Sequence, residues 1–333
     1  MKKLNLLLAV VGSAALLAGC GQKETKAYFG QGAVAAYAFT RSGDLQTTVD
    51  NVAVVTDLEG KITHLRLDTH QVTVKLVDGL HVTQNELADG DVKSKWELLD
   101  EYGMGSDTVK EWYVQAEMFE NWTVGKTLAD IKAGVGSDNY LTDKATIGVT
   151  IHVNGWVDAL ELALANKVEF TGAIKGLGVG AEVHTAKNRT SGAVEGHDVY
   201  VAGAVFAEGK KVLASRIDTF QPRYAIQEAT VDVPAKSIMA TNTQNDAANS
   251  RIKGKQELKE AYNMKGASPI GKEWYEQAAA LVALLPGKTV SEVLGTADVL
   301  ENGADLGVTI KIGGYRSTLL EAEHTAFNSR KPA

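Results

Sequence analysis

The same series of motifs occurs twice along the chain, and this repetition constrains the fold more than any other feature of the sequence. The matching segments keep the same order and a nearly constant offset in the two halves. They are Leu67-Asp68-Thr69 with Ile217-Asp218-Thr219, 95–104 with 255–264, Lys110-Glu111-Trp112-Tyr113 with Lys272-Glu273-Trp274-Tyr275, Gly125-Lys126-Thr127 with Gly287-Lys288-Thr289, and Gly148-Val149-Thr150 with Gly307-Val308-Thr309. Such colinear matches indicate a duplication. The unit is too long for a solenoid repeat, so we expect tandem domains, repeat 1 (28–166) and repeat 2 (167–333), each with its own core.

The order of hydrophobic patterns within each unit predicts an α+β fold. The expected elements of repeat 1 are strands at 52–56 and 62–67, helices at 94–102 and 108–122, a short helix from Thr127, a strand at 149–153 and a final helix at 157–165. Repeat 2 follows the same order, with a strand at 308–312 and a final helix at 317–326, and Ser268-Pro269 is expected to begin its long helix. A block of strands followed by helices is typical of the α+β class.

The N-terminus has the organisation of a cleavable export signal. Lys2 and Lys3 precede an apolar run at 4–17 that is too short to span a bilayer. The run ends in Leu17-Ala18-Gly19-Cys20, which resembles the lipobox of bacterial lipoproteins. That resemblance implies a signal peptide at 1–19, lipidation of Cys20, a tether at 20–27 and a location at the extracytoplasmic face of the cell membrane, held by the lipid anchor. The formal net charge of −7 argues against nucleic acid as a partner.

Several residue patterns carry weak chemical signals. The histidines do not recur between the repeats, so we interpret them as surface residues and expect no metal site. Asp68 and Asp218 are interpreted as turn residues, with a polar-ligand site as the alternative. The tryptophans at 112 and 274 are expected in the core. The glycine pairs Gly30/Gly32 and Gly176/Gly178, with Gly180, lack a dinucleotide-loop spacing and indicate a bend or a close approach of the backbone.

The paired motifs resemble those of largely uncharacterised lipoproteins of anaerobic Firmicutes. That group is similar to the flavin-binding lipoproteins of Gram-positive extracellular electron transfer, in which FMN is joined through its phosphate to the last residue of Asp-x-x-Ser/Thr-Gly-Ala-Ser/Thr. The resemblance implies FMN at Thr150 and Thr309, with Gly148 and Gly307 beside them. Ile147 and Leu306 stand where the family has Ser or Thr, and Val149 and Val308 where it has Ala.

The resemblance implies a membrane-anchored, extracytoplasmic FMN-binding-like lipoprotein that takes part in extracellular electron transfer. Its partners would be a membrane redox protein or a flavin transferase, and it would act as an electron carrier or binding protein rather than an enzyme. The alternative is a redox-free surface binding or scaffold lipoprotein. Gly313-Gly314 leaves more room than Asn154-Gly155, so we expect Thr309 to be the better flavin acceptor.

Overall fold

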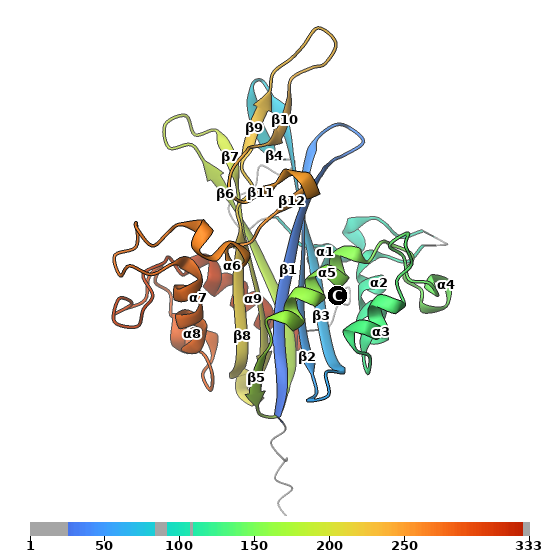
Figure 1. Cartoon of the computed structure of the whole chain (residues 1–333), viewed down its shortest axis with the longest axis vertical. Helices are drawn as coiled ribbons and strands as arrows, with labels where there is room; N and C mark the ends of the chain where they lie inside the picture. Colours follow the sequence, from blue (N-terminus) through green and yellow to red (C-terminus); the bar gives the residue numbers. More distant parts are fainter. Residues whose placement is uncertain (1–25, 84–91, 107–108, 329–333) are drawn as a thin grey trace, which may run out of the picture.

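The computed structural model describes residues 26–83, 92–106 and 109–328 (Figure 1). It confirms the α+β class: antiparallel sheets occupy the centre of the molecule, and helices lie on either side of them. The predicted signal peptide, Cys20 and most of the predicted tether lie outside the described residues.

Repeat 1 opens with a three-stranded antiparallel meander. Its strands are β1 (Lys26–Phe39), β2 (Leu45–Thr56) and β3 (Ile62–Val77), and β4 (Leu80–Thr83) adds to the edge. The expected hairpin is confirmed as β2–β3, with Val52 opposite Leu67. The sequence analysis missed β1, which begins within the last residues of the predicted tether.

The helices of repeat 1 follow the meander. They are α1 (Lys95–Leu98), continued by a 3-10 turn at Leu99–Tyr102, α2 (Trp112–Thr123), α3 (Leu128–Ala133), α4 (Lys144–Ile147) and α5 (Asn154–Ala165). Ser94 and Thr127 form capping boxes with Glu97 and Asp130, which explains why α1 and α3 begin where they do. The strand expected at 149–153 is wrong, because these residues form an irregular connection between α4 and α5.

Repeat 2 has the same order of elements around a longer insertion. Its meander is β6 (Gly176–Lys187), β7 (Val194–Phe206) and β8 (Val212–Phe220), preceded by β5 (Val168–Thr171). The helices are α6 (Lys255–Leu258), continued by a 3-10 turn at Lys259–Tyr262, α7 (Trp274–Ala283), α8 (Val290–Leu294) and α9 (Gly313–Phe327). Between β8 and α6 come β9 (Tyr224–Gln227), β10 (Lys236–Met239), β11 (Asn245–Asp246) and β12 (Arg251–Ile252).

Two sequence expectations for repeat 2 are wrong. The residues at 308–312 form no strand. Ser268-Pro269 does not begin the long helix, since α7 starts at Trp274 and Glu273 is its N-cap, in a capping box with Glu276. The Ser268 hydroxyl instead accepts a hydrogen bond of 3.0 Å from the Gln277 side-chain amide.

The final helix of each repeat packs directly on the first two strands of its own meander. α5 lies on β1 and β2, and α9 lies on β6 and β7. A Cβ atom on Gly30 would overlap the backbone of Ala163 in α5, and one on Gly178 would overlap the backbone of Ala322 in α9. The expectation of a close backbone approach at the glycine pairs is therefore confirmed, and the approaching element is a helix rather than a nucleotide.

The opposite faces of the two meanders pack against each other. Side chains alternate along a strand, so the face that turns away from α5 or α9 meets the other sheet. A cluster of buried residues fills the space between the sheets, and it takes Val49 and Val72 from repeat 1 and Val199 and Phe220 from repeat 2. The Asn51 side chain crosses this interface and donates to the carbonyl oxygens of Gly180 and Ala202, at 3.1 and 3.0 Å. The layers are therefore helix, sheet, sheet, helix.

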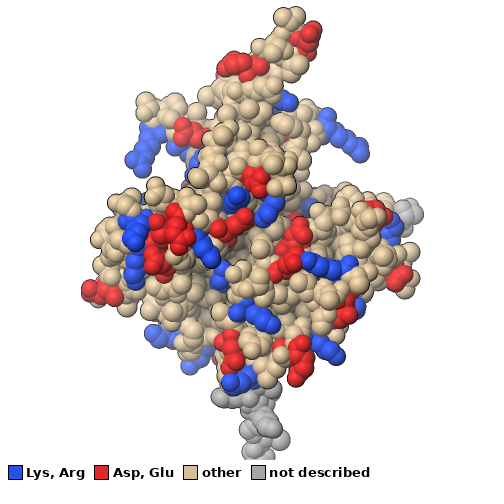
Figure 2. Space-filling view, viewed as in Figure 1, with Lys and Arg blue, Asp and Glu red and all other residues tan. Residues whose placement is uncertain are grey.

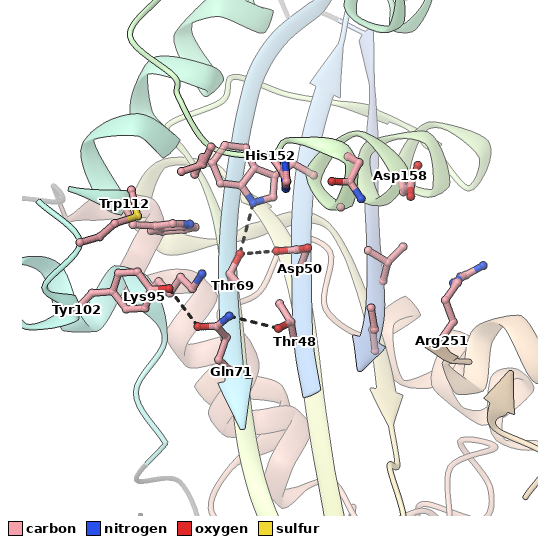
Figure 3. Close-up of a pocket in the computed structure, with 18 of the residues that line it drawn as sticks. Thr48, Asp50, Thr69, Gln71, Lys95, Tyr102, Trp112, His152, Asp158 and Arg251 are labelled. Atoms are coloured by element: carbon pink, nitrogen blue, oxygen red, sulfur yellow. Dashed lines mark hydrogen bonds between the residues drawn. The ribbon is translucent and has the colours of Figure 1, made fainter. Parts of the chain in front are cut away.

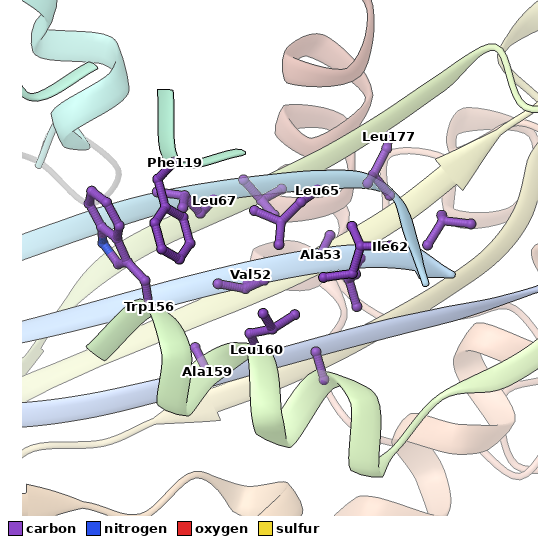
Figure 4. Packing of buried hydrophobic residues seen from close by; sticks show 14 of the residues in the cluster. Val52, Ala53, Ile62, Leu65, Leu67, Phe119, Trp156, Ala159, Leu160 and Leu177 are labelled. Atoms are coloured by element: carbon purple, nitrogen blue, oxygen red, sulfur yellow. The ribbon is translucent and has the colours of Figure 1, made fainter. Parts of the chain in front are cut away.

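The core has three parts. One lies under α5 and contains Leu67, Phe119, Trp156 and Leu160 (Figure 4). A second lies under α9 and is built from repeat 2 alone. The third, between the sheets, belongs to both repeats, which the expectation of two separate cores did not include. β12 of repeat 2 also pairs with β1 at Ala35 and Ala36, so the repeats share a sheet as well as a core.

Candidate functional site

A cavity of about 560 Å³ opens in repeat 1 beyond the N-terminus of α5 (Figure 3). Its floor is the helix-facing side of β1, β2 and β3, and its walls are α5 on one side and α1 and α2 on the other. Trp112, Trp156 and Tyr102 supply aromatic surface. The cavity is completed from repeat 2, because Asn249 and Arg251 beside β12 also line it. The volume lies within the range of about 300–1,000 Å³ that small-molecule sites occupy.

The floor carries a partly buried carboxylate, Asp50. The Thr69 hydroxyl donates to its Oδ1 at 2.5 Å, and the Trp156 indole N–H donates to the Thr69 oxygen at 3.4 Å. Burial raises the pKa of the Asp50 carboxyl, and the hydrogen bond from Thr69 and the positive charge of Lys95 oppose that rise. A Cβ atom on Gly155 would overlap this carboxylate, so a glycine in the first turn of α5 allows Asp50 its position.

A second group of polar side chains joins β2 and β3 to the wall that carries Tyr102. The Tyr102 hydroxyl donates to the Gln71 side-chain oxygen at 3.2 Å, and the Gln71 amide donates to the Thr48 hydroxyl at 3.3 Å. The Lys95 ammonium lies 4.6 Å from the ring centroid of Tyr102 and 5.7 Å from that of Trp112, which stabilises the cation between two aromatic rings. The cavity therefore combines aromatic walls with a cation, an amide and a carboxylate.

Asp68 holds the segment that forms one of these walls, and Asp218 makes the corresponding hydrogen bonds in repeat 2. The Asp68 carboxylate accepts the backbone N–H of Thr69 at 2.7 Å and that of Trp96, in the first turn of α1, at 3.1 Å. Asp218 accepts the N–H of Thr219 at 2.7 Å and that of Gln256, in α6, at 3.0 Å. Neither residue lies in a turn, so that interpretation is wrong. Both instead fix the start of a short helix to the edge of a sheet.

The four residues predicted to hold flavin lie on the connection before each final helix. Gly148 and Gly307 adopt positive φ angles of 83° and 78°, which explains why glycine stands there. Thr150 is exposed and Thr309 is half-buried. Ile151 and His152, which follow Thr150, line the cavity of repeat 1, whereas Thr150 itself is not part of the lining.

A buried glutamine holds each of these connections. The Gln115 side-chain oxygen accepts the backbone N–H of Thr150 at 2.7 Å and its hydroxyl at 3.3 Å. Gln277 makes the same two bonds with Thr309, at 2.7 and 3.1 Å. The backbone N–H groups that would pair with a neighbouring strand, had 149–153 and 308–312 formed strands, are bound by a glutamine side chain instead. The same glutamine oxygen also accepts the threonine hydroxyl.

A lysine lies against the glycine of each connection. The Lys110 ammonium is 3.1 Å from the position that a Cβ atom of Gly148 would take, and the Lys272 ammonium is 2.7 Å from that of Gly307. Within the described part of the chain, no carboxylate lies within ion-pair distance of either ammonium. The paired connections thus place a cation beside each glycine, two residues before each threonine.

In repeat 2 the corresponding space is occupied by tyrosines. Tyr200 stands where repeat 1 has Asp50, and Tyr315 stands where it has Trp156. Their rings meet edge to face with centroids 5.0 Å apart, and the Tyr315 hydroxyl is hydrogen-bonded to Thr219 at 2.7 Å and to Trp274 at 2.9 Å. A Cβ atom on Gly314 would lie 2.9 Å from the Tyr200 ring. Gly314 is thus packed against Tyr200 as Gly155 is against Asp50, and the greater room expected beside Thr309 stays a prediction.

Outcomes for the other sequence signals are mixed. Trp112 and Trp274 are each 2% exposed, which confirms their place in the core. His70 and His197 are buried, so the interpretation of the histidines as surface residues is wrong for these two. His197 is hydrogen-bonded to the Tyr224 hydroxyl at 2.7 Å. Among the described residues no group of three potential ligand side chains is arranged to bind a metal.

Comparison with protein-family models, with curated proteins and with solved structures finds no match to this chain. None of the helices in residues 26–83, 92–106 and 109–328 is long and apolar enough to cross a membrane. The sequence analysis missed Asp50 and Arg251 as site residues, because neither lies in a matched motif. Lys95 and Tyr102 lie in the matched segment 95–104, and this recurrence is a signal that could have identified them.

Proposed function

We propose that this chain is a membrane-anchored, extracytoplasmic lipoprotein that binds FMN in the cavity of repeat 1 and takes part in extracellular electron transfer. The observation that carries the proposal is an aromatic-walled cavity lined by Ile151 and His152, the two residues that follow the exposed Thr150. The anchor rests on the Leu17-Ala18-Gly19-Cys20 motif.

The residues present fit a flavin. The partly buried ring of Tyr102 suits a planar ring, and the Gln71 amide and the Asp50 carboxyl offer hydrogen bonds to a polar ring edge. The Lys110 ammonium beside Gly148 suits a phosphate attached at Thr150. FMN, when bound, supplies one- and two-electron chemistry. The protein would hold the ring, neutralise the phosphate and limit the access of water.

Charge on the visible surface does not favour any other site. In Figure 2, acidic and basic side chains are interspersed over the face that is seen, and neither sign gathers into a broad patch there. The face seen in Figure 2 thus has no strongly charged binding surface, and the support for the flavin site comes from the lining of the cavity of repeat 1.

Variants at Thr150 test the flavin assignment. We expect the chain co-expressed with a flavin transferase to show in-gel flavin fluorescence and the mass of one attached FMN. Thr150→Ala should abolish both signals, because it removes the hydroxyl that would form the phosphoester. Thr150→Ser keeps the hydroxyl and should retain them, and Thr309→Ala is the matched control in repeat 2. Fluorescence that disappears only with Thr309→Ala would contradict the assignment to repeat 1.

A redox-free binding lipoprotein is the second candidate, and one observation favours it. Both threonine hydroxyls already donate to a buried glutamine, so they have a structural role that needs no cofactor. Protein purified from its native host distinguishes the two functions. An unmodified mass, with no flavin released on denaturation, would exclude the flavin function and leave the same cavity as a site for another small molecule.

Cys20→Ala tests the anchor. Each buried CH₂ of a lipid chain contributes roughly 0.8 kcal/mol to membrane binding, and no described helix can replace it. We expect the variant to lose lipidation and to leave the membrane fraction during a high-salt wash, as measured by immunoblotting of both fractions. Retention of the variant in the washed membranes would show that the anchor assignment is wrong.

A further inference from the structure

A second cavity, of about 500 Å³, lies beyond the C-terminal end of α5, between α7, β8 and the paired strands β1 and β5. Most of its lining is apolar and includes Phe29, Val168, Leu213 and Pro286. One wall is polar and is formed by Arg216 and Gln256. The flavin proposal makes no use of this cavity.

The corresponding place in repeat 1 contains a carboxylate from the protein itself. Glu120 of α2 is buried, its Oε1 accepts the backbone N–H of Leu67 at 2.8 Å, and its Oε2 accepts from the Arg66 guanidinium at 3.1 Å. One carboxylate thus satisfies an edge-strand amide and neutralises the arginine beside it.

Repeat 2 keeps the donors of this arrangement and lacks the carboxylate. Arg216 and Ile217 correspond to Arg66 and Leu67 in the matched motif. Gln277 and Gln115 make the same bonds to the matched threonines, so counting along α7 and α2 places Val282 where repeat 1 has Glu120. Val282, Arg216 and Ile217 all line the second cavity.

In the part of the chain that the structure describes, no protein carboxylate neutralises Arg216 at the position that the Glu120 carboxylate takes in repeat 1. The guanidinium donates to the neutral Gln256 side chain at 3.2 Å, and among the described residues it has no carboxylate within ion-pair distance. Asp218 is nearby, but its carboxylate accepts two backbone N–H groups, and the corresponding Asp68 is also present in repeat 1 beside Glu120. Glu169 lines the cavity and is held by Lys26 at 2.7 Å.

We propose that the second cavity binds an apolar monocarboxylic acid, such as a medium-chain fatty acid. Its carboxylate takes the position that Glu120 occupies in repeat 1 and accepts from the Arg216 guanidinium and the Ile217 amide. Its hydrocarbon chain lies against the apolar residues between α7 and the β1–β5 pair. Repeat 1 thus shows, within the same chain, the carboxylate geometry that the ligand would reproduce.

Titration calorimetry of the mature chain (20–333) with decanoate tests this site. The chain carries Cys20→Ala so that no detergent competes for the fatty acid. We expect one decanoate per chain and much weaker binding of decanol, which has the same chain length without the carboxylate. Arg216→Gln should weaken decanoate binding about tenfold or more, because it removes a charged donor. Arg66→Gln, the matched change in repeat 1, should leave it unaltered.

Two further variants separate loss of binding from loss of folding. Val282→Glu should recreate the internal pair of repeat 1 and abolish decanoate binding. Ala279→Phe, at an exposed position that lines the cavity, should block binding without touching Arg216. Circular dichroism checks that each variant is folded. Absence of decanoate binding, equal affinity for decanol, or unchanged binding in folded Arg216→Gln and Ala279→Phe would each overturn the proposal. None of these outcomes depends on whether flavin is bound.

Discussion

The two repeats make the same backbone contacts and differ in the side chains that line their cavities. Asp68 and Asp218 accept corresponding N–H groups, as do Gln115 and Gln277. All four serve backbone donors that would otherwise lack a partner, and burying such a donor unpaired is costly. The motifs that recur in the sequence are therefore the ones that hold the fold together.

The positions that do not recur decide where each repeat is open. In repeat 1 the Asp50 side chain is small, so the cavity beside α5 stays open. In repeat 2 the larger Tyr200 side chain fills the corresponding space. At the second position the filled and open spaces are exchanged. Glu120 of α2 fills the space in repeat 1, and Val282 of α7 leaves it open in repeat 2. Each repeat thus keeps one of two spaces open, and a candidate ligand site is found where the repeats differ rather than where they agree.

The contact between the final helix and its sheet should be equally sensitive in both repeats. Gly30→Ala and Gly178→Ala would each drive a methyl group into helix backbone, which cannot move as a flexible side chain can. We expect each variant to lose at least about 3 kcal/mol of unfolding free energy, at the upper end of overpacking effects. Urea denaturation of the mature chain measures it.

Gly266→Ala is the control, since no atom lies within 4 Å of its added Cβ. It should change stability by no more than about 0.5 kcal/mol, as surface substitutions usually do. A large loss in only one of the two buried glycine variants would break the equivalence of the repeats at this contact.

A pH-dependent difference is expected from Asp218. Burial raises the pKa of its carboxyl to about 6, although two backbone N–H groups and Arg216 oppose the rise. A carboxyl whose folded-state pKa exceeds the unfolded value of 3.8 stabilises the fold below pH 4, and this contribution is lost as the pH rises through 6. A difference of one in pKa corresponds to about 1.4 kcal/mol, so the fold loses about 2–3 kcal/mol of unfolding free energy over this pH range.

Asp218→Asn sharpens this expectation, because the amide oxygen can accept the same two backbone N–H groups and cannot ionise. The difference in unfolding free energy between variant and wild type should shift in favour of the variant by about 2–3 kcal/mol from pH 4 to pH 7. Chemical denaturation at several pH values measures it. Parallel stability curves for the two proteins would contradict the assignment of this titration to Asp218.

Local signals in the sequence were sufficient for much of the fold. The β2–β3 hairpin, the capped short helices and the final helices follow from patterns within a few residues. The strand expected at 149–153 did not form even though Val149 and Val153 are buried as predicted, because Gln115 supplies the acceptor that a neighbouring strand would have supplied. β1 and β6 were missed because glycine and alanine, which their close packing on α5 and α9 requires, are poor strand formers.

The candidate sites depend on contacts that no local pattern records. The cavity of repeat 1 brings Asp50 of β2 together with Arg251, which follows it in the sequence by more than the length of one repeat. The second cavity became recognisable only when Val282 was compared with Glu120 across a shared backbone. The alternation of Thr150 and Thr309 with apolar neighbours predicted their outward position, but not the glutamines that hold them.

The smallest effect concerns the caps of the third helix in each repeat. Thr127 caps α3 and Thr289 caps α8, and each forms a capping box with an acidic residue three positions later. Each threonine hydroxyl accepts an N–H group that the first helical turn leaves without a partner, so replacement by alanine should cost about 1 kcal/mol. Because the two caps lie in different repeats and share no partner, the losses in Thr127→Ala and Thr289→Ala should be equal within about 0.5 kcal/mol and should add in the double variant. Urea denaturation of the three proteins gives these values, and Thr127→Ser with Thr289→Ser should restore most of the stability because serine keeps the hydroxyl. A double variant that loses much less or much more than the sum would show that the two caps are coupled through the shared sheet, and that the repeats do not behave as equivalent, independent units even at their surface.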